Sequence, residues 1–275
     1  MNMFVDLFGG GFNVGINVAA NGIVYNDSLQ QVSKMLQMFS EFDKNKIFAD
    51  IFKVIGDFNL SDSTKNTYAD YECNSSEGLG KYNKEAYLKL RDEYNNQFDK
   101  DAYESIILFY VLTCYSFSNQ IRFNSKGNFN MPYGKRDFNK NMQQNLDKFL
   151  DKLHSSKIRF FNKDFRKLKI DFLKPNDLVY CDPPYLITCA SYNENNGWNE
   201  QDERDLLNLL DSLNNNRVKF ALSNVLEEKG RSNDILKEWV KNYMVHKLDY
   251  SYSNCNYQKK DRDKNATVEV LITNY

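Results

Sequence analysis

The chain has few of the residues that build covalent or metal-held scaffolds. Its 275 residues include five cysteines and two histidines. The cysteine count is odd, no two cysteines are spaced as CxxC, and neither histidine has a partner at metal-ligand spacing. A disulfide framework and a zinc site are therefore disfavoured, and a reducing, cytoplasmic compartment is favoured. We predict no bound metal.

Long apolar runs and a large net charge are missing as well. No run approaches the roughly 18–20 residues of a membrane helix, and the apolar stretch 3–8 is interrupted by Asp6 and followed by glycines, unlike a signal peptide. The formal net charge is −1, so any contact with nucleic acid must come from local basic stretches. Hydrophobic residues make up 41%, which is enough for one large domain, or for a core domain with an insertion.

Strands and helices alternate at both ends of the chain. A strand is predicted at 3–7, glycines follow at 9–11, a second strand at 22–26 ends before Asp27, and 28–42 has helical spacing. This order is typical of the start of a doubly wound α/β sheet. Further helices are predicted at 200–213 and 232–241, and further strands at 157–161, 177–181, 217–223, 243–249 and 267–273.

The middle of the chain differs from both ends. Residues 61–80 are polar and read as a loop, while 84–98, 101–116 and 139–153 have helical patterns. Residues 118–140 are polar and aromatic with turn signals, which favours a hairpin or an ordered loop. We predict an α/β domain of residues 1–60 plus 155–275, interrupted by a mostly helical insertion of residues 61–154.

A glycine-rich loop, Phe8-Gly9-Gly10-Gly11, follows the first predicted strand and opens a helix. Glycines there let the backbone approach a ligand closely, although a simple tight turn is the alternative. The loop is not GxGxxG, so a dinucleotide cofactor is not favoured. Asp27, at the end of the next strand, is placed either to accept hydrogen bonds from a ribose diol or to cap the helix that starts at Ser28.

The stretch DLVYCDPPYL at 177–186 combines a core strand with an unusual end. Residues 178–181 are almost continuously apolar, as in a central parallel strand, and ligands of α/β sheets bind beyond the carboxyl ends of such strands. Prolines fix the backbone and leave only carbonyl acceptors. The Asp182 carboxylate and the Pro183 carbonyl, beside the flat face of Tyr185, suit a planar ring that bears an NH2 group. A strand-end turn is the alternative.

Two local stretches are basic. From 117 to 140 there are five cations and one anion, and from 157 to 169 six cations and one anion. Such stretches suit phosphate contacts, whereas Asn119, Gln120 and Arg122 have side chains that pair with base edges. Phe117 could stack or fill the gap left by a displaced base. The alternative is a solvated charged surface.

With its DPPY tetrad after the glycine loop FGGG (8–11), the chain resembles the S-adenosylmethionine-dependent amino-methyltransferases, in particular the Dam-like DNA adenine-N6 methyltransferases (D12 class, alpha group). The resemblance implies an α/β fold, a Rossmann-like methyltransferase sheet with a mostly helical DNA-recognition insertion. NKDF at 162–165 is similar to a short family motif near the cofactor adenine. The implied catalytic residues are Asp182, Pro183, Pro184 and Tyr185, and the implied cofactor-binding residues are Phe8, Gly9, Gly10, Gly11, Asp27, Asp164, Phe165 and Asp182.

The segment SNQIRFNSKGNFNMPYGKR at 118–136 resembles the DNA-reading segment of the same family. The resemblance implies that double-stranded DNA is the partner and that the enzyme methylates N6 of a flipped adenine at a specific site. The implied DNA-binding residues are Phe117, Asn119, Gln120, Arg122, Asn124, Lys126, Asn130, Pro132, Lys135 and Arg136.

Two other functions stay open at this point: an RNA adenine-N6 methyltransferase, and a non-catalytic DNA-binding subunit of a methyltransferase complex. A cognate restriction endonuclease or a second methyltransferase subunit is a possible partner, and no membrane is expected. The family usually has a cofactor-enclosing segment before its glycine loop, which here begins at residue 8. We expect that segment to be lost, to come from another chain or to lie outside this sequence. Tyr192 is a further candidate for holding the base, and a bacterial or phage-infected cell is the expected setting.

Overall fold

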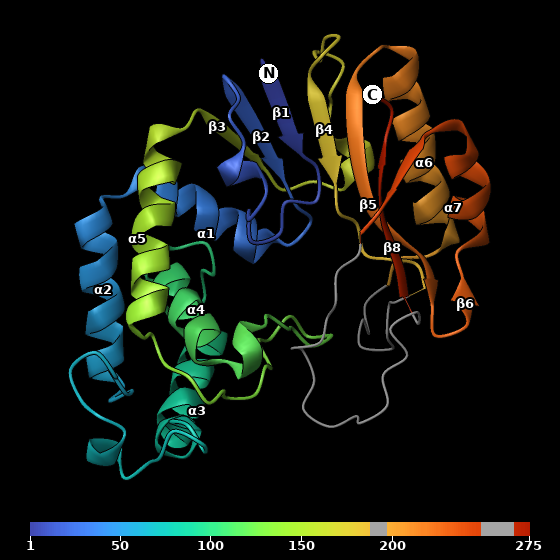
Figure 1. The fold of residues 1–275 in the computed structure, drawn as a ribbon. Coiled ribbons are helices and arrows are strands. Elements are labelled where there is room, and N and C mark those ends of the chain that lie inside the picture. The colour runs from blue at the N-terminus through green and yellow to red at the C-terminus, as the bar shows by residue number, and fades with distance from the viewer. Residues whose placement is uncertain (188–196, 249–266) are drawn as a thin grey trace. The chain divides into compact units, whose positions relative to one another are not determined.

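The structure is a computed structural model and describes residues 1–187, 197–248 and 267–275. It contains two compact units (Figure 1). Residues Met1–Leu29 and Lys157–Tyr275 form the first, which we call the sheet unit, and residues Gln30–Ser156 form the second, the helical unit. Tyr192, Cys189 and Cys255 lie outside the described residues.

The sheet unit has a mostly parallel sheet with the strand order β3-β2-β1-β4-β5-β8-β7 within the described residues. The first five of these are mutually parallel, whereas β8 runs antiparallel to both β5 and β7, and β6 pairs with β5 off this path. The strands are β1 (Met3–Asp6), β2 (Gly22–Asn26), β3 (Ile158–Phe161), β4 (Leu178–Cys181), β5 (Lys219–Glu228), β6 (Arg231–Ser232), β7 (Met244–Lys247) and β8 (Thr267–Thr273).

The core of the sheet unit lies between the central strands and two helices, α6 (Glu200–Asn215) and α7 (Asp234–Trp239), which Figure 1 shows together beside β5. Val5 of β1 and Val179 of β4 are paired in register and fully buried. Because both faces of such strands are covered, their sequences are nearly continuous apolar runs. The strands predicted from those runs are therefore present, with differences of a few residues at their ends.

After the glycine loop the chain forms only a 3-10 turn, Gly15–Asn17, instead of the predicted helix. A side chain at Gly15 would collide with the Phe12 ring, and the Gly15 N–H is bound by Asp6. The turn is therefore held by contacts with its own strand. Two other 3-10 turns in this unit are Phe165–Lys167 and Val240–Asn242.

The helical unit contains five helices within its described residues: α1 (Gln30–Glu41), α2 (Lys44–Asp57), α3 (Gly80–Asn96), α4 (Tyr103–Tyr115) and α5 (Lys140–Ser155). Two 3-10 turns, Ala69–Tyr71 and Phe117–Asn119, complete it. The apolar helix α4 lies at its centre and contacts α1, α2 and α3. None of the helices among the described residues is long and apolar enough to cross a membrane.

Helix α2 was not predicted, and with α1 it moves the division between the units from residue 60 to residue 29. Asp43 caps α2, and Ile47, Ile51 and Ile55 form its buried face. Both helices pack on α4, so they belong with the helical unit. Spacing indicates that a helix forms, but it does not show which core the helix covers.

The predicted hairpin region is an ordered loop closed by two isolated bridges, Ser116 to Tyr133 and Phe123 to Phe129. Gly134 is required at its end, because a side chain there would lie 2.4 Å from the Ser116 carbonyl oxygen. Just after this loop, the buried Asp137 accepts hydrogen bonds from the backbone N–H and the hydroxyl of Ser63. These bonds tie the end of the loop to the segment between α2 and α3.

Candidate functional site

A pocket of about 550 Å³ opens at the carboxyl ends of β1, β2 and β4 in the sheet unit. Its volume falls within the range of roughly 300–1,000 Å³ that is typical of small-molecule sites. It is lined by Asp6, Phe8, Gly9, Gly10, Gly11, Asn13, Val14, Asp27, Ser28, Tyr180, Asp182, Pro183, Pro184 and Tyr185. The pocket thus brings together the glycine loop, Asp27 and the DPPY tetrad, which are far apart in sequence.

The glycine loop is held tightly against β2. The Gly9 N–H donates to the Asn26 carbonyl at 2.8 Å, and the Tyr25 hydroxyl donates to the Gly10 carbonyl at 2.9 Å. A side chain at Gly9 would lie 2.4 Å from the Tyr25 ring, and Gly10 has a φ of +46°. Glycine is needed at both positions, at the first for space and at the second for its backbone conformation.

Asp27 binds the backbone that leads into α1, which begins at Gln30 and not at Ser28, and it also contacts the glycine loop. One carboxylate oxygen accepts the Leu29 N–H at 2.8 Å, and the other accepts the Gly10 N–H at 2.9 Å. The carboxylate therefore links the end of β2 to the loop while it lines the pocket. Its contact with a ribose stays a prediction.

Asp6 lines the pocket although it was not among the predicted site residues. It ends β1, is paired in register with Tyr180 of β4, and is only 2% exposed. Its Oδ2 atom accepts the Gly15 N–H at 2.9 Å. Burial raises the pKa of Asp6 to about 6, and the nearby Asp182 and Asp27 charges add to the rise. The acid that interrupts the apolar stretch 3–8 was the available signal, since β1 and β4 end at the same edge. The other unpredicted lining residues are Asn13, Val14, Ser28 and Tyr180.

The DPPY tetrad follows β4 and forms one wall of the pocket. The Tyr185 hydroxyl donates to Asp182 Oδ1 at 2.8 Å and is 3.0 Å from the Ser223 hydroxyl. Asp182 is open to the pocket, yet partial desolvation raises the pKa of its carboxyl; the Tyr185 bond opposes this rise and the charge of Glu269 adds to it. A carboxylate acceptor and an aromatic ring are therefore side by side, as a site for a planar amine requires.

Asp164 and Phe165 do not line this pocket. Asp164 accepts the Arg166 backbone N–H at 2.9 Å and pairs with its guanidinium, which also binds Asp202 and Asp205. Phe165 is buried and packs on Phe8, with 5.4 Å between ring centroids. Phe165 thus packs against the first residue of the glycine loop, and contact of Asp164 or Phe165 with the cofactor stays a prediction.

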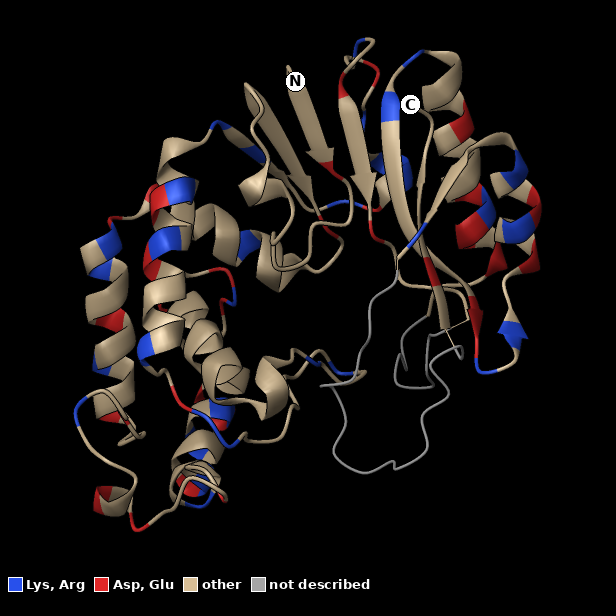
Figure 2. Cartoon of the chain, in the orientation of Figure 1, with Lys and Arg blue, Asp and Glu red and all other residues tan. Residues whose placement is uncertain are grey.

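The predicted DNA-binding residues lie on the loop of the helical unit and fall into two groups. In the first, side chains hold the loop together: Arg122 donates to the Asn130 side chain at 2.8 Å, and Asn124 accepts two backbone N–H groups. Asn119 likewise donates to the Cys114 carbonyl at 2.9 Å. The exposed group consists of Phe117, Gln120, Lys126, Pro132, Lys135 and Arg136. Figure 2 marks the cations among them.

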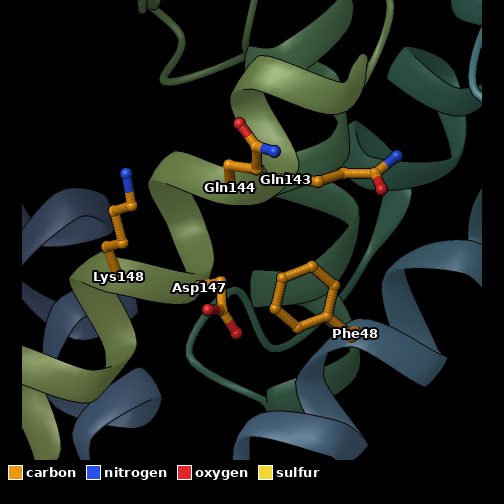
Figure 3. A pocket seen from close by; sticks show the side chains of 5 residues that line it. All are labelled: Phe48, Gln143, Gln144, Asp147 and Lys148. Atoms are coloured by element: carbon orange, nitrogen blue, oxygen red, sulfur yellow. The ribbon is translucent and has the colours of Figure 1, made fainter.

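Besides the pocket of the sheet unit, there is a hollow in the helical unit, which is shown in Figure 3. It is lined by Phe48 of α2 and by Gln143, Gln144, Asp147 and Lys148 of α5. Asp147 is already paired with Lys44 at 2.7 Å and Gln143 donates to the Phe138 carbonyl at 2.8 Å, so these two polar groups of the hollow are engaged with the protein itself. Across the described parts of both units, no three His, Cys, Asp or Glu side chains are grouped as metal ligands.

A mostly parallel sheet whose first glycine loop and DPPY tetrad share a pocket defines a Rossmann-like methyltransferase fold. The chain belongs to the D12 class N6 adenine-specific DNA methyltransferase family, whose model matches residues 1–254. Both the fold class and the family predicted from the sequence are therefore confirmed.

Similar proteins include two named DNA-modifying enzymes, a type II methyltransferase and a modification methylase, which match this chain over its whole length. It is 38% identical over 281 residues to the type II methyltransferase M.FokI of Planomicrobium okeanokoites and 36% identical over 283 residues to the modification methylase StsI of Streptococcus sanguinis. The chain spans about two-fifths (39%) of each of these relatives. It is also 25% identical to a DNA adenine methylase of Salmonella typhi over 59% of this chain and 56% of that protein.

Proposed function

We propose that the chain transfers a methyl group from S-adenosylmethionine to N6 of an adenine that has been flipped out of duplex DNA. The observation that carries this proposal is the single pocket in which Asp182 and Tyr185 meet the glycine loop and Asp27. Membership of the D12 class supports adenine N6 as the target and DNA, in preference to RNA, as the substrate.

The residues of the pocket fit the proposed cofactor. Apart from its neighbours in the chain, no atom of the described residues lies within 4 Å of where a side chain at Gly10 would begin, so the loop leaves room for a ligand. Asp27 is placed at the end of β2, where a carboxylate accepts hydrogen bonds from a ribose diol in related folds. Asp6 and Asp182 add negative charge, which suits a positively charged ligand. When bound, S-adenosylmethionine supplies a methyl group attached to a cationic sulfur.

The tetrad would position the amine. Asp182 and the Pro183 carbonyl accept its two hydrogens, so the nitrogen lone pair is directed to the methyl group, while Tyr185 stacks on the ring. As the nitrogen gains positive charge, the Asp182 carboxylate stabilises that charge in a site from which water is partly excluded. The excess proton then passes from the nitrogen to the Asp182 carboxylate and on to water, and no protein nucleophile is needed.

The loop 117–136 would contact the DNA. Its exposed cations Lys126, Lys135 and Arg136 suit phosphates, and the amide of Gln120 suits a base edge. The relatives named as modification methylases support a role beside a cognate endonuclease, in the bacterial cytoplasm where the DNA lies.

The test is a methylation assay with the purified chain, tritiated S-adenosylmethionine and a long unmethylated DNA duplex. The wild-type chain should produce N6-methyladenine, which mass spectrometry identifies after digestion. Asp182→Asn keeps the shape of the side chain but removes its charge, and it should lower kcat by about 10²–10³-fold. Asp171→Asn changes an exposed acid of the same unit and should have no effect.

Equal thermal unfolding of both variants would show that the loss is chemical. Undiminished methylation by Asp182→Asn would refute the assignment of the site. Transfer to structured RNA but not to duplex DNA would favour the RNA alternative, and DNA binding without transfer would favour a non-catalytic subunit.

A further inference from the structure

Ser223 is a buried hydroxyl that lies level with the tetrad. It belongs to β5, where the preceding residue Leu222 is paired in register with Cys181, the last residue of β4. Ser223 is 6% exposed and is not itself among the residues that line the pocket. Its hydroxyl therefore reaches the site only through neighbouring side chains.

The hydroxyl of Ser223 adjoins the phenol of the tetrad, with 3.0 Å between Ser223 Oγ and Tyr185 Oη. The Tyr185 proton is directed to Asp182 Oδ1 at 2.8 Å, because an ionised carboxylate can only accept. Ser223 must then donate its own proton to Tyr185 Oη.

The hydroxyl end of Tyr185 is thus bound at two points, by an acceptor that follows β4 and by a donor on β5. We propose that Ser223 is a positioning residue for methyl transfer, which holds the Tyr185 ring in its stacking orientation before the base enters. The proposal rests on the proposed function. Holding a contact group in advance removes an ordering cost from the reacting complex.

The kinetic test is a double-mutant cycle. Ser223→Ala should lower kcat by about threefold to tenfold, the effect of one lost hydrogen bond, and leave the KM for S-adenosylmethionine unchanged. In a Tyr185→Phe background the same change should cost less than about twofold, because the hydroxyl through which Ser223 acts is gone. Ser223→Thr restores a hydroxyl and should recover activity.

Thr273→Val is the matched control. It removes a buried hydroxyl from β8 in the same sheet, where that hydroxyl contacts His246 and the carbonyl of Tyr275. It should leave kcat unchanged. Equal losses from Ser223→Ala in both backgrounds, or no loss in the wild-type background, would overturn the proposal.

A measurement that needs no methylation separates this proposal from the proposed function. With ¹³Cζ-labelled tyrosine, the NMR signal that disappears in Tyr185→Phe should shift in Ser223→Ala and stay in place in Thr273→Val. An unshifted signal would refute the positioning contact even if the enzyme were active. A shifted signal in a chain without methyltransferase activity would preserve the contact and refute only the proposed function.

Discussion

Glu203 offers a sharp test of how the sheet unit supports its site. The side chain is fully buried on α6, and no cation pairs with it among the described residues. Instead, Oε2 accepts the Trp198 indole N–H at 2.6 Å, and Oε1 accepts the amides of Asn224 at 3.1 Å and Asn233 at 2.9 Å. Trp198 packs in turn on the Phe8 ring, with centroids 5.6 Å apart.

Neither asparagine can reverse its amide to suit a new partner. The oxygen of Asn224 accepts the Val225 N–H at 2.7 Å, and the oxygen of Asn233 accepts the Leu236 N–H at the start of α7. All three groups around Glu203 are therefore fixed as donors, and an acceptor-only side chain is required in their midst.

Glu203→Gln introduces a donor where only acceptors fit. In its better orientation, the glutamine oxygen accepts hydrogen bonds from both asparagines. Its NH2 group then faces the indole N–H, so both of these buried donors are left unpaired. One lost charge-assisted hydrogen bond and the unpaired groups should lower the free energy of unfolding by about 2–4 kcal/mol, partly offset because a buried charge is removed. Equilibrium urea unfolding measures this change.

Glu200→Gln is the control on the same helix. That side chain is 72% exposed and forms only a 3.7 Å ion pair with Arg204, so its loss should cost less than about 1 kcal/mol. If Glu203→Gln were as stable as Glu200→Gln, the network would not support the structure as argued. The indole fluorescence of Trp198 would report whether its environment changes in step with stability.

Two further predictions concern charge. The pKa of Asp6 is raised from 3.8 to about 6 in the folded chain, so between these pH values the folded state holds a proton that the unfolded state has already lost. The free energy of unfolding should therefore fall by up to about 3 kcal/mol as pH rises from about 4 to about 6. Urea midpoints at several pH values should show this slope in the wild type and less of it in Asp6→Asn, and equal slopes would contradict the assignment. Lys126→Ala, on the exposed part of the loop, should weaken DNA binding and reduce the slope of log K against log salt by about 1 without changing the melting temperature; an unchanged slope would place the loop away from phosphate.

The sheet could be predicted from the sequence because its central strands carry their signal locally. Residues 178–181 are apolar without alternation, which only a doubly covered strand tolerates, and Asp182 marks where that strand ends. The helix α2 gave a weaker signal, and its assignment to the helical unit depends on contacts with α4 that spacing does not encode.

The site was harder to predict where one side chain has two roles. The family resemblance of NKDF implied a cofactor contact for Asp164, but the carboxylate is engaged by Arg166 and does not line the pocket. Asp6 was passed over as a mere interruption of an apolar run, although parallel strands that end at one edge bring their last side chains together. Strand order, which the sequence does not state, places Asp6 beside Tyr180 at that edge.

Strand order also explains why acidic groups gather at this edge. Asp6, Asp27 and Asp182 all line one pocket, and their mutual repulsion contributes to the raised pKa of Asp6. The negative charge of Glu269 on β8 also contributes to the raised pKa of Asp182. Like charges held together by the sheet are stabilised by a cation placed among them, and much less by a neutral group. Under the proposed function, this acidic edge would favour the positively charged sulfur of the methyl donor over the uncharged thioether that remains after methyl transfer, and that difference would help the product to leave.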